Sequence, residues 1–102
     1  MNEIEFRNWM KENNVKDKVI SDCVSRLKRI EQECNHCDLD KEYRSDRCEF
    51  LLGAFEKMGI NDNMKKYSNA NFLIGKYHMS TYRYSLKKYI AFCDQVSISK
   101  QK

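Results

Sequence analysis

The hydrophobic positions of this chain recur three and four residues apart, which is the spacing of one buried helix face. The clearest example is the segment 79–94, MSTYRYSLKKYIAFCD. Its apolar stripe consists of Met79, Tyr82, Leu86, Tyr89, Ile90 and Cys93. Its opposite face consists of Ser80, Thr81, Tyr84, Lys87, Lys88 and Ala91. The segment is therefore predicted to be an amphipathic helix with a core-facing side and a side that carries positive charge, hydroxyls and one exposed ring.

Two helices are predicted in the first third of the chain. The first spans Glu3–Glu12, with Asn2 as its N-cap and Asn13-Asn14 as its stop. Its apolar residues are Ile4, Phe6, Trp9 and Met10. The second spans Asp17–Glu33 and is predicted to be the longest regular segment of the chain. Its buried stripe is predicted to be Val19, Ile20, Cys23, Val24, Leu27 and Ile30.

The middle of the chain shows shorter patterns. Residues 35–38 are expected to form a loop, after which Asp40 caps a single turn over 41–44. Asp46 and Glu49 form a capping-box-like start for a third helix, 47–58, and Gly59 stands where a left-handed C-terminal residue is expected. The buried residues predicted for this helix are Cys48, Leu51, Leu52, Phe55 and Met58. A long connection, 60–77, follows and is expected to be pinned to the core by Phe72, Leu73 and Ile74.

The scarcity of helix breakers favours an all-α fold. The chain has 102 residues, no proline and three glycines. This length suffices for one domain with a core of its own. The prediction is a single compact bundle of four main helices, with a possible fifth short one, over residues 1–96. Residues from 96 onward are expected to fray, with 97–102 as a flexible C-terminal tail.

The net charge of +4 is distributed unevenly. Residues 1–51 hold 10 Lys and Arg against 12 Asp and Glu, whereas residues 52–102 hold 9 against 3. Seven of the 12 aromatic residues lie between Tyr67 and Phe92. A basic half rich in aromatic residues indicates a polyanionic partner such as nucleic acid. The alternative is an ordinary core covered by solvated lysines.

The five cysteines leave two alternatives open. Cys34 and Cys37 form a C-x2-C pair around His36, but zinc normally takes a second pair of ligands. Cys23 and Cys48 stand singly at core-facing positions, so buried thiols are favoured over structural zinc. A redox C-x-x-C is typical of a strand-to-helix junction, which the pattern lacks. No metal or cofactor is expected.

Catalytic signatures are not apparent in this sequence. His78 has no nucleophile or orienting acid placed near it by spacing, and Gly75 alone makes no phosphate loop. Asp38 and Asp40 fall where helix-start carboxylates are expected. The chain is therefore predicted not to be an enzyme.

Recognition of nucleic acid is the remaining prediction. Contacts with phosphates need basic and hydroxyl side chains along one surface, and the sequence supplies such residues. Around the start and outer face of the last helix the candidates are Lys76, His78, Ser80, Thr81, Arg83, Tyr84, Lys87 and Lys88. A second group, from the helix 17–33, comprises Lys18, Lys28 and Arg29. Ser80, Tyr84 and Lys87 are the first candidates for reading base edges.

Three segments of the chain resemble a known family. FRNWMKEN, VISDCVSRLKRIE and STYRYSLKKYIAFCD are similar to the core-binding, SAM-like helical domain of phage integrases and other tyrosine recombinases. The resemblance implies a bundle of four to five helices that clamps one side of a DNA duplex, with its second and last helices approaching the groove. By that resemblance, the DNA-facing positions here are Lys18, Ser21, Ser25, Arg29, Tyr84, Lys87 and Lys88.

The chain departs from that family in its catalytic motifs. The recombinase His-x-x-Arg motif is missing, since neither His36 nor His78 is followed three residues later by arginine. Three interpretations of the chain remain: a fragment of a longer enzyme, a free-standing DNA-binding module, or a small protein whose helical bundle binds another protein. Because the first residue is methionine, the interpretation as a complete small protein or as an N-terminal fragment is favoured.

The favoured hypothesis is a non-catalytic module of phage or mobile-element character that binds duplex DNA. Basic faces of the second and last predicted helices would make the contacts. The alternative is a small phage or mobile-element protein that binds or inhibits a protein partner through the same face. No apolar run approaches the ~20 residues that span a bilayer. The acidic start MNEIEF is not a secretory signal, so a cytoplasmic location without membrane contact is expected.

Overall fold

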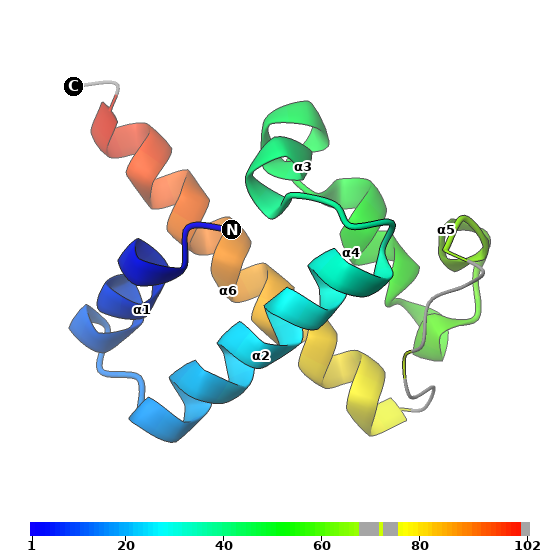
Figure 1. Cartoon of the computed structure of the whole chain (residues 1–102), viewed down its shortest axis with the longest axis horizontal. Coiled ribbons are helices and arrows are strands. Elements are labelled where there is room, and N and C mark those ends of the chain that lie inside the picture. Colours follow the sequence, from blue (N-terminus) through cyan, green and yellow to red (C-terminus); the bar gives the residue numbers. More distant parts are fainter. Residues whose placement is uncertain (68–71, 73–75, 101–102) are drawn as a thin grey trace.

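The regular structure of the chain is helical throughout the part that the computed structural model describes, residues 1–67, 72 and 76–100 (Figure 1). The predicted all-α class is therefore confirmed. The α-helices are α1 (Glu3–Glu12), α2 (Asp17–Glu33), α3 (Leu39–Asp46), α4 (Glu49–Ala54), α5 (Asp62–Lys65) and α6 (Lys76–Lys100), and a 3-10 helix, η1 (Lys57–Gly59), follows α4. Three long helices and several short ones thus replace the four main helices that were predicted.

Helices α1 and α2 have the predicted bounds. The carbonyl of Asn2 accepts from the N–H of Phe6, although its side chain makes no capping bond. Asn14 takes a left-handed conformation (φ 62°) and ends the first helix as predicted. In α2 the predicted stripe is buried at Ile20, Cys23, Val24, Leu27 and Ile30. The remaining member of the stripe, Val19, is half-buried.

The corner between α2 and α3 differs from the prediction. Asp38, not Asp40, caps α3, because its carboxylate accepts from the N–H of Asp40 at 3.1 Å. Leu39 is fully buried and its N–H donates to the Glu31 carboxylate at 3.0 Å. These contacts start the helix earlier than the single turn expected over residues 41–44.

The predicted third helix, 47–58, does not form as one piece. Arg47 and Cys48 both adopt left-handed conformations (φ 58° and 62°), so the helix begins only at Glu49. The physical reason for these left-handed conformations is a pair of tertiary contacts. The left-handed pair buries the Cys48 thiol, whose Sγ donates to the Leu39 carbonyl, and turns the Arg47 guanidinium to Asp94. Asp46 still accepts from the N–H of Phe50 at 3.0 Å, but it is not the N-cap of α4.

The end of this region contains a second correction. Met58 was predicted to be buried and is 49% exposed, because Lys57 and Met58 take left-handed conformations just after α4. Gly59 has the left-handed conformation that was predicted (φ 79°). Phe72 is buried in the core as expected, whereas Leu73 and Ile74 lie outside the described residues.

Replacing Gly59 with alanine is expected to lower the free energy of unfolding by about 1–3 kcal/mol. An L side chain is strained at this φ, and its Cβ would come within 2.9 Å of Met79 Sδ. Urea denaturation followed by circular dichroism measures the loss. Asn14→Gly is the matched control, because glycine relieves left-handed strain at that position, and it should not destabilise the protein. A Gly59→Ala protein as stable as the parent would contradict this explanation.

Helix α6 is the central element of the fold. In Figure 1 it runs diagonally across the molecule, with α1 on one side, α3 and α4 on the other and α2 crossing it, and it packs against all four. The predicted stripe from Met79 to Ile90 is buried, and Cys93 is half-buried. Ser85 and Phe92 are buried as well, since neighbours flank α6 on both sides. The helix continues to Lys100, through most of the segment expected to fray, and residues 101–102 lie outside the described part.

Aromatic rings fix α6 at two levels. Near α1, the Phe6 ring lies 5.2 Å from that of Tyr89 and 5.6 Å from that of Phe92. Near α4, the Phe55 ring lies 5.2 Å from that of Phe72 and 5.5 Å from that of Tyr82. Contacts of this kind add to the burial energy of each ring. They pack α6 against α1 on one side and against the end of α4 on the other.

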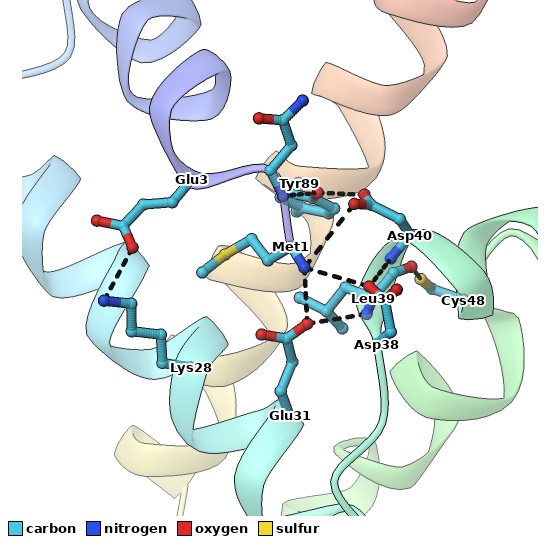
Figure 2. Close-up of polar contacts among 10 residues, drawn as sticks. Met1, Glu3, Lys28, Glu31, Asp38, Leu39, Asp40, Cys48 and Tyr89 are labelled. Atoms are coloured by element: carbon cyan, nitrogen blue, oxygen red, sulfur yellow. Dashed lines mark hydrogen bonds and ion pairs between the residues drawn. The ribbon is translucent and has the colours of Figure 1, made fainter.

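A polar network ties the first two residues to three helices (Figure 2). The Met1 amine donates to Glu31 Oε2 at 2.9 Å and to Asp38 Oδ1 at 3.2 Å. The Tyr89 hydroxyl accepts from the N–H of Asn2 at 2.8 Å and donates to Asp40. Burial opposes the charge on the amine, but hydrogen bonds to the two carboxylates outweigh burial and raise the pKa of Met1. The network therefore joins the start of α1 to α2, α3 and α6.

Candidate nucleic-acid interface

Helix α6 carries an excess of positively charged residues. Among the residues of this helix are four lysines and one arginine against a single acid, Asp94. Tyr84 is 43% exposed and Lys87 is exposed, while Lys88 is half-buried. The Lys88 Nζ lies 5.7 Å from the centre of the Tyr84 ring, within the range of a cation–π contact. Within the part of the chain that the structure describes, neither Lys87 nor Lys88 forms an ion pair.

The one acid on α6 is neutralised by a residue that the sequence did not suggest. The Arg47 guanidinium pairs with the Asp94 carboxylate, and the Tyr43 hydroxyl donates to the same carboxylate at 2.6 Å. The Arg47 hydrogen bond is the main reason that the pKa of Asp94 is lowered. This arrangement leaves the positive charge of Lys87, on the same side of α6, uncompensated by Asp94. No local pattern indicated Arg47, since it lies far from Asp94 in sequence.

Other predicted residues of α6 serve the fold at least in part. Arg83 is half-buried and its guanidinium donates to the Phe55 carbonyl at 2.7 Å, which joins α6 to the end of α4. Ser80 and Thr81 are half-buried and have partners within the protein. They are therefore less available to a ligand than Tyr84 and Lys87.

Two further predicted residues, Lys76 and His78, lie in the first turn of α6. Their side chains fall outside the described part, so the structure places their backbone only. Their contribution to an interface stays a prediction.

The predicted residues of α2 are exposed, and their helix carries as many acidic as basic residues. These residues are Lys18, Ser21, Ser25, Lys28 and Arg29. Lys28 forms an ion pair with Glu3 at 2.8 Å, and Arg29 also has a partner within the protein. Over its length α2 has four basic and four acidic residues, which leaves it with no net charge. The face is thus a weaker candidate than that of α6.

The two predicted faces also do not combine into one surface. Helices α2 and α6 pack against each other, and each directs its buried stripe into the core. The exposed sides of both helices therefore point away from their shared interface, on different sides of the molecule. A single duplex lying on Tyr84 and Lys87 would not rest on Lys18 and Ser25 at the same time.

A shallow hollow beside Lys87 extends the α6 face toward α4. It has a volume of about 310 Å³ and is lined by Arg47, Glu49, Leu52, Lys87, Ile90, Ala91 and Asp94. The mixture of charges and apolar atoms does not define a small-molecule site.

Among the residues that the structure describes, no group of side chains is arranged to bind a metal ion. No three His, Cys, Asp or Glu side chains come together there as metal ligands would. Cys34 and Cys37 lie in the turn after α2, whereas Cys23 is buried within α2 and Cys48 at the start of α4. The second ligand pair that zinc requires is not assembled around the C-x2-C turn.

Four thiols instead have strongly raised pKa values. Burial is the main cause in each, and it raises the pKa to about 12 in Cys34, Cys48 and Cys93 and to about 11 in Cys37. Neighbouring carboxylates, including that of Glu42, raise the pKa values of Cys34, Cys48 and Cys37 further. These thiols are protonated at neutral pH.

The raised pKa values predict a loss of stability at alkaline pH. Thiols of the unfolded chain ionise near pH 9, while those of the folded chain stay protonated until a higher pH. The stabilisation is therefore complete below about pH 9 and falls as the pH rises toward the folded-state values. Urea denaturation at a series of pH values under reducing conditions measures this fall. In a Cys48→Ala/Cys93→Ala variant the slope should be smaller, and a parent profile that stays flat through about pH 10.5 would contradict the prediction.

None of the described helices is both long enough and apolar enough to cross a membrane. The chain matches no protein-family model, no curated protein and no solved structure in the three comparisons made. The function must therefore be inferred from the residues and the geometry above.

Proposed function

We propose that the chain is a non-catalytic DNA-binding module that contacts duplex DNA through the outer face of α6. The observation that carries the proposal is the combination of Tyr84, Lys87 and Lys88 on that face, with both lysines outside any ion pair of the described structure. Basic side chains free to meet phosphates supply most of the affinity of non-specific DNA binding. The hydroxyl of the exposed Tyr84 among them can donate a hydrogen bond to a phosphate.

The shape of α6 supports the same proposal. The helix has 25 residues and is therefore roughly 37 Å long, comparable to one turn of a DNA duplex. Lys87 and Lys88 lie near the middle of this length, and the acid of the helix is already paired with Arg47. An extended polyanion can therefore follow the helix on both sides of the two lysines.

The resemblance to recombinase core-binding domains points to the same class. In the proposal, the chain is a bundle of that type, of phage or mobile-element character, that works in the cytoplasm. The proposal differs from the original expectation in one respect. It assigns the contact to α6 and leaves the α2 face out of the primary surface, because α2 has no net charge and faces a different side.

The class is tested by the fluorescence anisotropy of a labelled duplex of about 30 base pairs at low ionic strength. Saturable binding that unlabelled duplex reverses is expected. Absence of duplex affinity under these conditions would contradict the proposal. If the protein then bound an acidic polypeptide, the alternative of a protein partner at the same basic face would take its place.

A further inference from the structure

The turn after α2 brings two cysteines together. Asn35 and His36 both adopt left-handed conformations (φ 60° and 51°), and the N–H of Cys37 donates to the Cys34 carbonyl at 3.2 Å. Such a β-turn holds its first and fourth Cα atoms within about 7 Å. Disulfides span Cα distances of roughly 4.4–6.8 Å. The backbone therefore places Cys34 and Cys37 within the range of a disulfide.

The two thiols differ in their access to solvent. Cys34 is 1% exposed, whereas Cys37 is half-buried, and all five cysteines are free thiols. Both border a hollow of about 430 Å³, together with His36, Lys66 and Tyr67. A small reagent can therefore reach Cys37 from the hollow, which the buried Cys34 also lines. Buried Cys48, in contrast, is held by the Leu39 carbonyl.

We propose that Cys34 and Cys37 form an oxidation site at which a peroxide-class oxidant produces an intramolecular disulfide. The Cys37 thiolate attacks one peroxide oxygen, the O–O bond breaks, and the departing hydroxide takes up a proton to become water. The Cys34 sulfur then attacks the resulting sulfenic acid, the S–O bond breaks, and the hydroxyl leaves as water with the Cys34 proton. Two thiols lose two electrons and two protons in total, and the peroxide is reduced to two waters.

The surroundings determine the rate of this reaction. Burial and the carboxylates of Glu42, Glu31 and Asp38 keep Cys37 protonated at neutral pH. The other charged or titratable groups that border the hollow are His36, Lys41, Lys66 and Tyr67. Because the thiolate is the reacting species, the oxidation rate should rise about tenfold for each pH unit below the pKa of Cys37.

The disulfide would fix the corner between two helices. Cys34 is the C-cap of α2, and Cys37 directly precedes Asp38, which caps α3 and accepts from the Met1 amine. Since the backbone already makes this turn, closing it should cost the folded state little. Thiol reagents such as dithiothreitol would reverse the reaction.

The test is oxidation of the folded full chain by hydrogen peroxide at about pH 8.5, followed by alkylation and trypsin digestion. The tryptic peptide 30–41 contains Cys34 and Cys37 and no other cysteine. The expected product is this peptide with two hydrogens lost, about 2 Da lighter than its reduced form and free of alkylation. Cys37→Ser should abolish the product, and Cys93→Ser, which changes another half-buried thiol, should not.

Two outcomes would overturn the inference. One is alkylation of peptide 30–41 at both cysteines while other thiols pair or oxidise. The other is an oxidised protein that melts at a lower temperature than its reduced form, because the turn would then resist the bond. A melting temperature equal to or above that of the reduced form supports the inference. Mass mapping on the parent chain keeps the test valid even if a variant folds poorly.

Discussion

Replacing Phe6 with alanine will lower the free energy of unfolding by about 3–5 kcal/mol. Phe6 is 0% exposed and packs against the rings of Tyr89, Phe92 and Trp9, so it docks α1 onto the central helix. The substitution removes an entire buried ring and leaves a cavity that the surrounding rings fill only in part. Urea denaturation monitored by circular dichroism measures the loss.

Ile4→Ala is the matched control for this variant. Ile4 lies on the same helix and is also large and apolar, but it is 76% exposed. Its replacement should change the free energy of unfolding by less than about 0.5 kcal/mol. Equal effects of the two substitutions would show that α1 does not dock as described. The comparison matters because the sequence pattern counted both residues among the apolar positions of one helix.

The double variant Lys87→Glu/Lys88→Glu is expected to lose at least about tenfold of its duplex affinity at low salt. Both lysines lie on the outer face of α6 and neither forms an ion pair in the described structure, so the change removes the proposed phosphate contacts without breaking an internal ion pair. Reversed charges also repel the remaining phosphates. Anisotropy titrations with the same duplex measure the loss, and circular dichroism checks the fold.

The matched control is Lys16→Glu/Lys18→Glu, which changes the net charge by the same amount at the start of α2. Both lysines are exposed, and acidic residues at a helix start are compatible with folding. This control should retain most of the duplex affinity because α2 faces a different side from the α6 surface. If the control loses as much affinity as the α6 variant, the surface has been assigned to the wrong helix.

Local patterns predicted much of the fold. The bounds of α1 and α2 followed from the spacing of their apolar residues. The end of α1 also followed from Asn13 and Asn14, because this stop signal lies next to the helix in the sequence. The inner stripe of α6 followed from the same spacing. In these elements, local preference and burial agree.

The errors arose where distant contacts decide the backbone. Arg47 and Cys48 have helical neighbours, yet both take left-handed conformations that serve a buried thiol and a contact with Asp94. Asp38 rather than Asp40 caps α3 because Leu39 must enter the core beside Glu31. No pattern within a short window contains this information.

The candidate site was predicted in part. The exposure of Tyr84 and Lys87 followed from helical spacing. The interaction of Arg47 with Asp94 and the different directions of the α2 and α6 faces depend on how helices pack, which spacing does not encode. The proposed surface therefore uses only the part of the predicted set that lies on α6.

The most direct test of the proposed DNA-binding surface is the salt dependence of duplex affinity. Each phosphate contact contributes about −0.9 to the slope of log affinity against log salt, so Lys87 and Lys88 together predict a slope of about −2 or steeper. Anisotropy titrations between about 50 and 300 mM salt give this slope. The Lys87→Glu/Lys88→Glu variant, where it still binds, should have a slope shallower by about 1.8. A slope near zero for the parent chain, or a slope that the double variant leaves unchanged, would contradict DNA binding through the outer face of α6.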